Sequence, residues 1–425
     1  MHDEPQTLQT AAPPARTSKP TATVGDSPAP DRPALWVARI VLVGLVLAAL
    51  NLRPAITSLG ALLEEVRDGL HMSGSVAGVL TSVPPLCFAV FGVMAPRLAR
   101  RFGPAAVVCA GMAAIFAGLA VRPFASGTVG FLAASALALM GIAVSNVLMP
   151  VIVKRYFPDR VGSVTGLYSM ALALGTSLAA AATVPMTEAL GGSWRVGLGV
   201  WGILAALAVL PWVPLLRDRA TAPTAARAPS AAPLRITRSR TAWVLGAYFG
   251  LQATGAYITM GWMPQIFRDA GVPAGTAGVL LAVTMVMGVP LAFVIPRLAT
   301  RLRTQGPIVI ALGLCGLVGY TGLLLAPAGG AWVWAVLLGV SNCSFPLALT
   351  MIGMRSRSSA GVVRLSAFAQ SVGYLISIPG PLLVGVLYQH SGGWGLPIAL
   401  MAGLMIPQMV VGTLAGRDRT VEDEC

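Results

Sequence analysis

The chain alternates between long apolar runs and short polar connections. Runs of about 20 apolar residues are long enough to cross a bilayer as α-helices. Each run therefore predicts one transmembrane helix, and we number the predicted spans one to twelve along the chain. Their approximate bounds are 36–63, 74–96, 104–121, 128–153, 162–186, 195–216, 241–267, 275–296, 307–326, 331–354, 362–388 and 394–415. This pattern predicts an all-α membrane protein.

Composition and charge agree with a membrane location. Of the 425 residues, 56% are hydrophobic and 10% are charged, whereas soluble domains carry about 25% charged residues. The formal net charge of +14 suits nucleic acid binding, but the basic residues concentrate in the tails and in every second connection. This positive-inside distribution predicts that both termini are cytoplasmic. It also accounts for the Arg-rich connection 217–240, so we expect the lipid bilayer and no nucleic acid as a partner.

Short segments recur about 200 residues apart along the chain. The recurring pairs are residues 77–80 and 277–280 (AGVL), 96–99 and 296–299 (PRLA), and 145–146 and 341–342 (SN). Each pair falls in equivalent spans or connections, which indicates an internal repeat. Because each half holds an even number of spans, the halves are expected to run parallel, related by an axis along the membrane normal.

The repeat predicts how the chain is divided. The first 34 residues are rich in Pro, Ala and Thr, a composition typical of disorder. Arginine far outnumbers lysine, which favours a bacterial origin. The predicted parts are a disordered cytoplasmic tail at 1–34, an N-terminal six-helix bundle at 35–216, a cytoplasmic linker loop at 217–240, a C-terminal six-helix bundle at 241–415 and a cytoplasmic tail at 416–425.

One charged residue lies near the centre of span one. It is Arg53, and none of the 15 acidic residues falls inside a span. An arginine at the bilayer centre costs about 2.5–3.5 kcal/mol on insertion scales, so it usually faces protein or a wet cavity. We expect a bound anion to complete its environment through a forked hydrogen bond. The alternative is that Arg53 pairs with helix carbonyls and locks the two halves together.

Polar side chains gather in a subset of the spans. Hydrocarbon penalises unpaired amides, so these side chains should face inward. Pro54 is expected to open the helix at Arg53. Asn146 and Asn342 occupy equivalent positions, and they either hold a ligand from two sides or bond helix to helix. The candidate substrate-binding residues are Asn51, Arg53, Thr57, Asn146, Tyr168, Gln252, Tyr257, Asn342, Gln370 and Tyr374.

The connection after span two carries a family resemblance. Residues 92–101 read Gly-Val-Met-Ala-Pro-Arg-Leu-Ala-Arg-Arg, which is similar to the Gly-x-x-x-Asp-Arg-x-Gly-Arg-Arg pattern of the major facilitator superfamily. Pro96 replaces the acid and Ala99 replaces the second glycine. The resemblance implies the major facilitator fold, with a cytoplasmic gate of Arg97, Arg100, Arg101 and Asp159. Asp159 pairs with Arg97 or Arg100 in this hypothesis, whereas in the alternative the arginines serve topology alone.

Within that superfamily the chain resembles the cyanate and 2-nitroimidazole permease family. The resemblance rests on residues 51–54 (NLRP), 145–158, 250–252 (GLQ) and 369–374 (AQSVGY). It implies that the solute is a small anion or a small polar aromatic. We therefore expect an alternating-access secondary transporter that moves a small anionic or polar, cyanate-like solute held by Arg53 in a central cavity. The alternative function is export of small drug-like or nitro-aromatic compounds.

The spans lack the residues for catalysis or metal binding. They contain no histidine and no acid, so hydrolysis at membrane depth has neither a base nor a metal ligand set. We expect no enzyme activity, no cofactor and no metal, and a monomer in the cytoplasmic (inner) membrane. Buried titratable groups for proton coupling are also missing, and the nearest acids are Glu64, Glu65 and Glu188. Four arginines, Arg67, Arg122, Arg195 and Arg268, are assigned to the outer connections.

Overall fold

The computed structural model describes residue 2 and residues 35–217 and 235–424. Within these ranges the chain is almost entirely helical and has no β-strand. The all-α prediction is therefore confirmed. The predicted tail 1–34, apart from residue 2, and residues 218–234 of the predicted linker lie outside the described residues.

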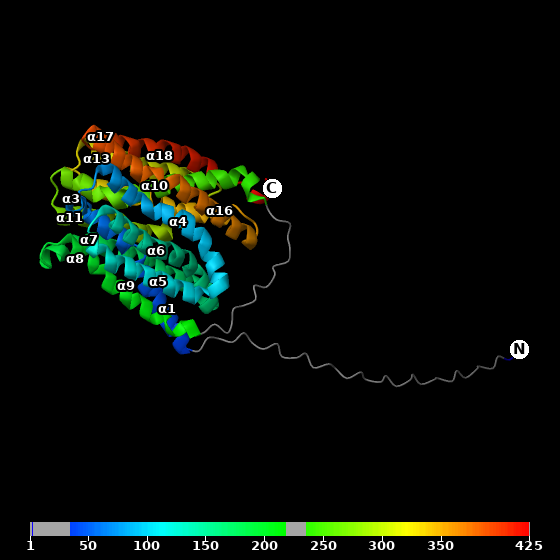
Figure 1. Ribbon diagram of the computed structural model, residues 1–425. Coiled ribbons are helices and arrows are strands. Elements are labelled where there is room, and N and C mark those ends of the chain that lie inside the picture. Colours follow the sequence, from blue (N-terminus) through cyan, green and yellow to red (C-terminus); the bar gives the residue numbers. More distant parts are fainter. Residues whose placement is uncertain (1, 3–34, 218–234, 425) are drawn as a thin grey trace. The chain divides into compact units, whose positions relative to one another are not determined.

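The helices of the first half span most of residues 35–217 (Figure 1). Two short 3₁₀ turns, η1 (Arg122–Phe124) and η2 (Pro158–Arg160), connect longer helices. The α-helices are α1 (Leu35–Asn51), α2 (Pro54–Ala61), α3 (Leu63–Gly69), α4 (Gly74–Phe102), α5 (Pro104–Val121), α6 (Thr128–Tyr156), α7 (Val161–Ala189), α8 (Trp194–Gly199) and α9 (Trp201–Val209).

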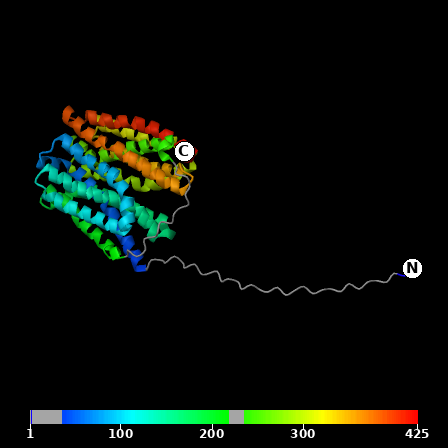
Figure 2. The ribbon, with the colours of Figure 1, turned by 45° about the vertical axis from the view of Figure 1, so that its right-hand side comes forward.

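The helices of the second half begin after a 3₁₀ turn, η6 (Ile236–Arg238), and a further turn, η7 (Val421–Asp423), lies near the C-terminus. The α-helices are α10 (Arg240–Asp269), α11 (Ala274–Val286), α12 (Gly288–Arg301), α13 (Gly306–Leu325), α14 (Ala331–Asn342), α15 (Ser344–Met354), α16 (Ser359–Ser377), α17 (Pro379–Ser391) and α18 (Gly395–Ala415). Figures 1 and 2 show them running alongside the first-half helices, with α4 next to α16 and α17.

Eleven helical stretches in the described ranges are long and apolar enough to cross a membrane. They correspond to predicted spans one to six and eight to twelve. Predicted span seven coincides with α10, which has 30 residues but is not among the eleven. Its buried polar side chains weaken its apolar character, and they are Gln252, Thr254, Thr259 and Gln265. A count of twelve spans therefore requires α10 to cross the membrane as well. Its polar side chains are buried against other helices instead of facing lipid.

Span one is broken next to Arg53, as Pro54 predicts. Helix α1 ends at Asn51 and α2 begins at Pro54, which occupies the first position of the new helix. Proline is suited to that position because the missing N–H would have no intrahelical partner there. The carbonyl of Arg53 then accepts the amides of Ile56 and Thr57 at 2.9 and 3.1 Å. The break places Arg53 at a helix end in the middle of the span.

The recurring AGVL segments make equivalent contacts in the structure. A Cβ atom at Gly78 of α4 would lie 2.9 Å from the carbonyl oxygen of Leu382 on α17. A Cβ atom at Gly278 of α11 would lie 2.5 Å from the carbonyl oxygen of Ala180 on α7. Glycine is needed at both positions because only it permits so close an approach of two backbones. Each contact joins a helix of the first half to a helix of the second.

Candidate functional site

Arg53 lies at the break in span one and is half-buried. Its guanidinium carbon lies 5.9 Å from the centre of the Phe88 ring on α4, a cation–π distance. Three ion pairs occur among the described residues, and none of them involves Arg53. The guanidinium is therefore inside the helix bundle without a carboxylate partner in the described part of the chain.

Aromatic rings from both halves gather beside Arg53. The Phe88 and Tyr374 rings stack with centroids 4.9 Å apart, and Phe249 meets Tyr374 edge-on at 5.2 Å. Tyr257 lies 6.5 Å from Tyr374, and both tyrosines are within electrostatic reach of Arg53. The Tyr257 hydroxyl approaches the guanidinium, but it has no hydrogen bond of good geometry within the described ranges. We call these five residues the Arg53 cluster.

Two other predicted residues, Asn51 and Thr57, support the backbone around Arg53. The Thr57 hydroxyl donates to the Arg53 carbonyl at 3.3 Å. Asn51 Nδ2 donates to the carbonyls of Leu47 at 2.9 Å and Leu204 at 3.1 Å. Leu204 belongs to α9, so Asn51 ties span one to span six. Both side chains are buried, and these contacts stabilise the broken helix behind Arg53.

A polar pocket lies in the second half of the chain and spans about 270 Å³, including space open to solvent. It brings together two residues that the sequence predicts as substrate-binding, Gln252 and Asn342. The Oε1 atoms of Gln252 and Gln408 are buried without a hydrogen-bond partner among the described residues. The polar side chains lining it are Gln252, Thr259, Tyr320, Ser341, Asn342 and Gln408. These groups are neutral, so the cavity offers hydrogen bonds without charge.

Three predicted residues lie apart from both the Arg53 cluster and this polar cavity. Asn146 on α6 and Tyr168 on α7 are half-buried. Gln370 on α16 donates from Nε2 to Ser366 Oγ at 2.7 Å. Neither Asn146 nor Asn342 forms a side-chain hydrogen bond within the ranges the structure describes, so the alternative of a helix-to-helix bond is not seen in this conformation. Of these two asparagines, only Asn342 lines the polar cavity.

The predicted cytoplasmic gate residues are exposed. Arg97, Arg100 and Arg101 lie in the last two turns of α4, and Asp159 lies in η2. Over residues 35–217 and 235–424, no ion pair joins Asp159 to Arg97 or Arg100. The expected pairing is therefore absent from this conformation.

The opposite ends of the helices carry a network that joins the two halves. Arg268 at the end of α10 pairs with Glu64 at 2.8 Å and with Glu65 at 2.9 Å. The neighbouring Asp269 accepts hydrogen bonds from the Tyr388 hydroxyl at 3.0 Å and from Trp394 Nε1 at 2.7 Å. We call this the outer network, because charge distribution predicts that it faces outside. The sequence contains a signal for this network. Glu64 and Glu65 follow span one, and Arg268 follows the equivalent span seven, so opposite charges end the two spans on the same side.

Arg122 lies in the connection after α5, where the sequence places it, but its guanidinium is buried. The sequence pattern assigns Arg122 to an outer connection, yet its side chain is 1% exposed. Nη1 donates to the Ala55 carbonyl at 3.2 Å, and the guanidinium carbon lies 5.5 Å from the centre of the Phe131 ring. The residue directly follows α5, so its side chain reaches back among the helices instead of outward. Hydropathy alone gives no sign of that direction.

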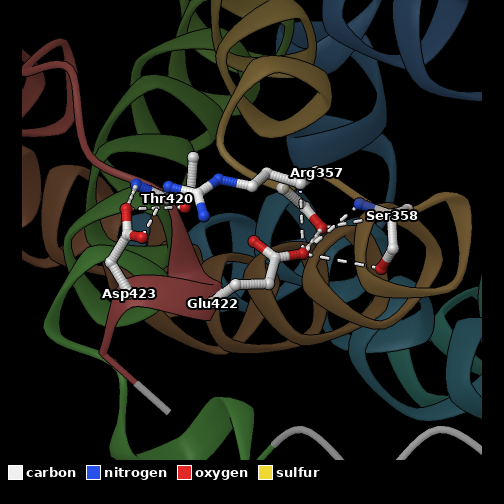
Figure 3. A network of polar contacts seen from close by, with 6 residues as sticks. Arg357, Ser358, Thr420, Glu422 and Asp423 are labelled. Carbon is white, nitrogen blue, oxygen red and sulfur yellow. Dashed lines mark hydrogen bonds and ion pairs between the residues drawn. The ribbon is translucent and has the colours of Figure 1, made fainter.

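The C-terminal segment after α18 docks on the ends of α10 and α16 (Figure 3). Glu422 accepts the Arg357 amide at 3.0 Å, and Asp423 pairs with the Arg357 side chain at 2.6 Å. Glu424 accepts the Ser239 hydroxyl at 2.6 Å and the Thr241 amide at 2.9 Å. Glu422 and Glu424 thus lie at helix N-termini, where negative charge is favourable. We call residues 420–424 the C-terminal clasp.

Apolar helices long enough to cross a membrane, with polar and charged groups collected inside, define a multi-pass membrane protein of the carrier class. The family model of the Major Facilitator Superfamily matches residues 41–378. The chain therefore belongs to the major facilitator superfamily, and its relatives are transporters, not enzymes.

Three bacterial relatives cover most of the chain. The uncharacterized transporter YycB of Bacillus subtilis (strain 168) is 36% identical over 90% of this chain and 94% of its own. The 2-nitroimidazole transporter of Escherichia coli (strain K12) is 33% identical over 90% and 97%. The cyanate transport protein CynX of the same organism is 30% identical over 86% and 95%. The family resemblance expected from sequence motifs is confirmed.

Solved structures agree on the fold. The nucleoside transporter NupG is similar with a TM-score of 0.71 and 11% identity, over 89% of this chain and 98% of that one. A bacterial homolog of the human lysosomal transporter Spinster, in an inward-facing and occupied conformation, gives a TM-score of 0.69 and 16% identity over 90% and 96%. At such low identities the similarity shows the fold alone, which is the major facilitator fold.

Proposed function

We propose that the protein is an alternating-access carrier for a small anionic or polar, cyanate-like solute, and that Arg53 binds the negative or electron-rich group of that solute. The observation that carries this proposal is the half-buried Arg53 guanidinium, which has no carboxylate partner within the described residues. A buried charge without a counter-ion is costly. An anionic solute lowers that cost by pairing with the guanidinium.

The relatives support a solute of this size. One is named as a cyanate transport protein and another as a 2-nitroimidazole transporter. Cyanate is a small anion that suits a lone guanidinium. The neutral polar cavity around Gln252 and Asn342 then supplies hydrogen bonds to the rest of a larger polar solute.

A second candidate function is export of a small drug-like or nitro-aromatic compound. The aromatic rings of the Arg53 cluster favour it, because Phe88, Phe249 and Tyr374 offer flat faces and edges to a planar ring. Arg53 would then bind the nitro group. Both candidates use the same cluster and differ in whether the aromatic rings or the charge dominate affinity.

The contacts between the halves support an inward-facing conformation. The outer network and the contacts of Gly78 and Gly278 close the predicted outer end. The predicted gate residues Arg97 and Asp159 at the other end are exposed and unpaired in this described conformation. In the proposed cycle the outer network breaks as the gate residues meet. The halves 35–216 and 241–415 would rock as two bodies in a cytoplasmic-membrane monomer whose termini are both cytoplasmic.

The proposal is tested by binding and transport with Arg53 variants. Purified protein is reconstituted in liposomes and offered cyanate, nitrate and 2-nitroimidazole. We expect Arg53→Ala to abolish uptake of the anions. Arg53→Lys keeps the charge but loses the forked geometry, so we expect anion affinity to fall about 10- to 100-fold, the range for a charge-assisted hydrogen bond. The exposed Arg303→Gln, outside the predicted gate, is the matched control. Unchanged anion transport by Arg53→Ala would overturn the proposal.

A further inference from the structure

A second pocket lies beside Arg122, between helices of the first half and α10 of the second half. It spans about 350 Å³, including space open to solvent. Most of its wall is apolar, glycine or proline, and four polar side chains line it: Thr81, Arg122, Ser135 and Tyr257. This cavity is separate from the polar cavity around Gln252, although Tyr257 also belongs to the Arg53 cluster.

Three of these polar groups lack partners. The Nε and Nη2 atoms of Arg122 are buried without a hydrogen bond among the described residues, as are the hydroxyls of Ser135 and Tyr257. A guanidinium has five N–H donors, and the Ala55 carbonyl accepts only from Nη1 at 3.2 Å. Thr81, by contrast, is satisfied, since its hydroxyl donates to Ala77 at 3.0 Å and accepts from Trp262 Nε1 at 3.2 Å.

The charge of Arg122 is also uncompensated. None of the ion pairs formed by residues 35–217 and 235–424 includes Arg122. The Phe131 ring at 5.5 Å offers it only a cation–π contact. Taking an ion out of water costs several kcal/mol unless a counter-charge and hydrogen bonds replace the solvent. A buried guanidinium with free donors, beside the free Ser135 hydroxyl and the Tyr257 hydroxyl, is thus arranged to receive a hydrogen-bond acceptor that carries negative charge.

We propose that this cavity is a second binding site for a small monovalent anion, held by Nε and Nη2 of Arg122 and by the hydroxyls of Ser135 and Tyr257. The inference rests on the proposed function. It adds a second binding position, beside Arg122, on the transport path of the same solute. Ala55, which accepts from Arg122, lies two residues after Arg53, and Tyr257 contributes to both sites. The Arg122 site lies on the side of α5 that is predicted to face outside.

The two binding sites, at Arg53 and at Arg122, have different surroundings. Arg53 is half-buried and lies against aromatic rings, so it can meet a solute that enters from the open end. The Arg122 side chain is buried, and its pocket is lined mainly by aliphatic, glycine and proline residues with Thr81, Ser135 and Tyr257. The narrow space beside Arg122 admits only a very small solute, whereas an aromatic ring suits the Arg53 cluster. The Arg122 site therefore selects for small anions and not for nitro-aromatic compounds.

The test measures anion-dependent stabilisation of the purified full chain in detergent, with cyanate and nitrate as small-anion probes and 2-nitroimidazole as the aromatic comparison. We expect Arg53→Ala to keep a residual shift in melting temperature with the anions, and Arg53→Ala/Arg122→Gln to lose it. Ser135→Ala in the Arg53→Ala background leaves the Arg122–Ala55 hydrogen bond in place. It should weaken the residual anion affinity about five- to tenfold, as expected for one lost hydrogen bond.

The matched control is Arg195→Gln, because Arg195 Nη1 donates to the carbonyls of Pro123 and Ala125 at 2.6 and 2.9 Å beside the same turn. It should leave the anion response unchanged. A purely structural Arg122 would lower the baseline melting temperature of Arg122→Gln without changing the anion-dependent increment, and that result overturns the inference. A complete loss of anion response in Arg53→Ala alone also overturns it while leaving the Arg53 proposal standing. No anion response in the wild type defeats the proposed function itself.

Discussion

Phe88 and Tyr374 stack with their ring centroids 4.9 Å apart, although they belong to opposite halves of the chain. The Phe88 ring also lies under the Arg53 guanidinium at 5.9 Å. One aromatic pair therefore contacts the candidate binding group and connects the halves that must move in an alternating-access cycle. A change in solute position or in the angle between the halves would alter the geometry of the Phe88–Tyr374 stack.

Replacing Phe88 should separate the two candidate functions. Aromatic stacking contributes about 0.5–1.5 kcal/mol beyond burial, so we expect Phe88→Leu to weaken 2-nitroimidazole binding about two- to tenfold. Cyanate has no ring, and its affinity should change less. Titration calorimetry with both solutes measures the difference, and Phe116→Leu on the exposed side of α5 is the control. Equal losses for both solutes would contradict a stacking role for Phe88.

The outer network should bias the carrier toward its inward-facing conformation. Arg268→Ala removes both ion pairs to Glu64 and Glu65, so we expect the outward-open population to rise. Ser75 hydrogen-bonds Gln389 across the same interface at 2.7 Å, and a cysteine introduced at Ser75 should be labelled faster by an impermeant thiol reagent in the Arg268→Ala background. Arg195→Ala is the control at the same end. Unchanged labelling would show that the network does not hold the outer end closed.

Glu64 and Glu65 should be dispensable for energy coupling, because both are engaged in the outer network and neither lies within an apolar span. We expect transport driven by the solute gradient, by exchange or by a proton carried with the anion. Counterflow and uptake under an imposed pH gradient should therefore change in parallel in Glu64→Gln and Glu65→Gln. A variant that keeps exchange but loses its response to the pH gradient would defeat this expectation.

The C-terminal clasp should be stable at neutral pH and weaken in acid. Burial raises the pKa of Glu422, but hydrogen bonds from Ser356, Arg357 and Ser358 together outweigh it and lower the pKa. Hydrogen bonds from Ser239 and Thr241 likewise lower the pKa of Glu424 against burial. A depressed folded-state pKa means that the stabilisation is present above the unfolded value of about 4.3 and is lost as pH falls through the folded value.

Hydrogen exchange at Val421 measures this, because its amide donates to the Arg355 carbonyl at 2.9 Å and reports whether the clasp is docked. Relative to the intrinsic chemical exchange rate, we expect its protection to fall in acid, below the unfolded value of about 4.3, and to fall at neutral pH in Glu422→Gln. Asp418→Asn, an exposed acid of the same segment, is the matched control. Protection that is insensitive to Glu422→Gln would refute the role of this carboxylate.

Glycine at the repeated AGVL positions should be required for close helix packing. Alanine at Gly278 would place its Cβ atom 2.5 Å from the Ala180 carbonyl oxygen. Overpacking of this kind costs about 1–3 kcal/mol, so we expect a lower melting temperature and weaker transport. Gly275→Ala in the same helix is the control, since nothing lies within 4 Å of its added Cβ. Similar behaviour of the two variants would contradict the packing argument.

The sequence by itself determined the features that depend on local composition. Apolar runs give the spans, because a segment must match the bilayer thickness whatever its neighbours are. Pro54 gives the break beside Arg53, because it lacks the N–H that would continue the preceding helix and its ring disfavours helical backbone at Arg53. The polar residues Gln252 and Asn342 share a cavity because amides avoid lipid. The span pattern is weakest at α10, where buried polar groups reduce the apolar signal.

Only the tertiary structure decided which side chains meet. Phe88 carries no signal inside an apolar span, and its place beside Arg53 and Tyr374 depends on how α4 packs against α16. Arg122 stands one residue beyond α5, where a long side chain can extend to the headgroups or turn inward. The Arg122 guanidinium points inward because it contacts the Ala55 carbonyl and the Phe131 ring there. Direction at a helix end is set by the available partners, and partners from distant segments are known only once the helices are packed.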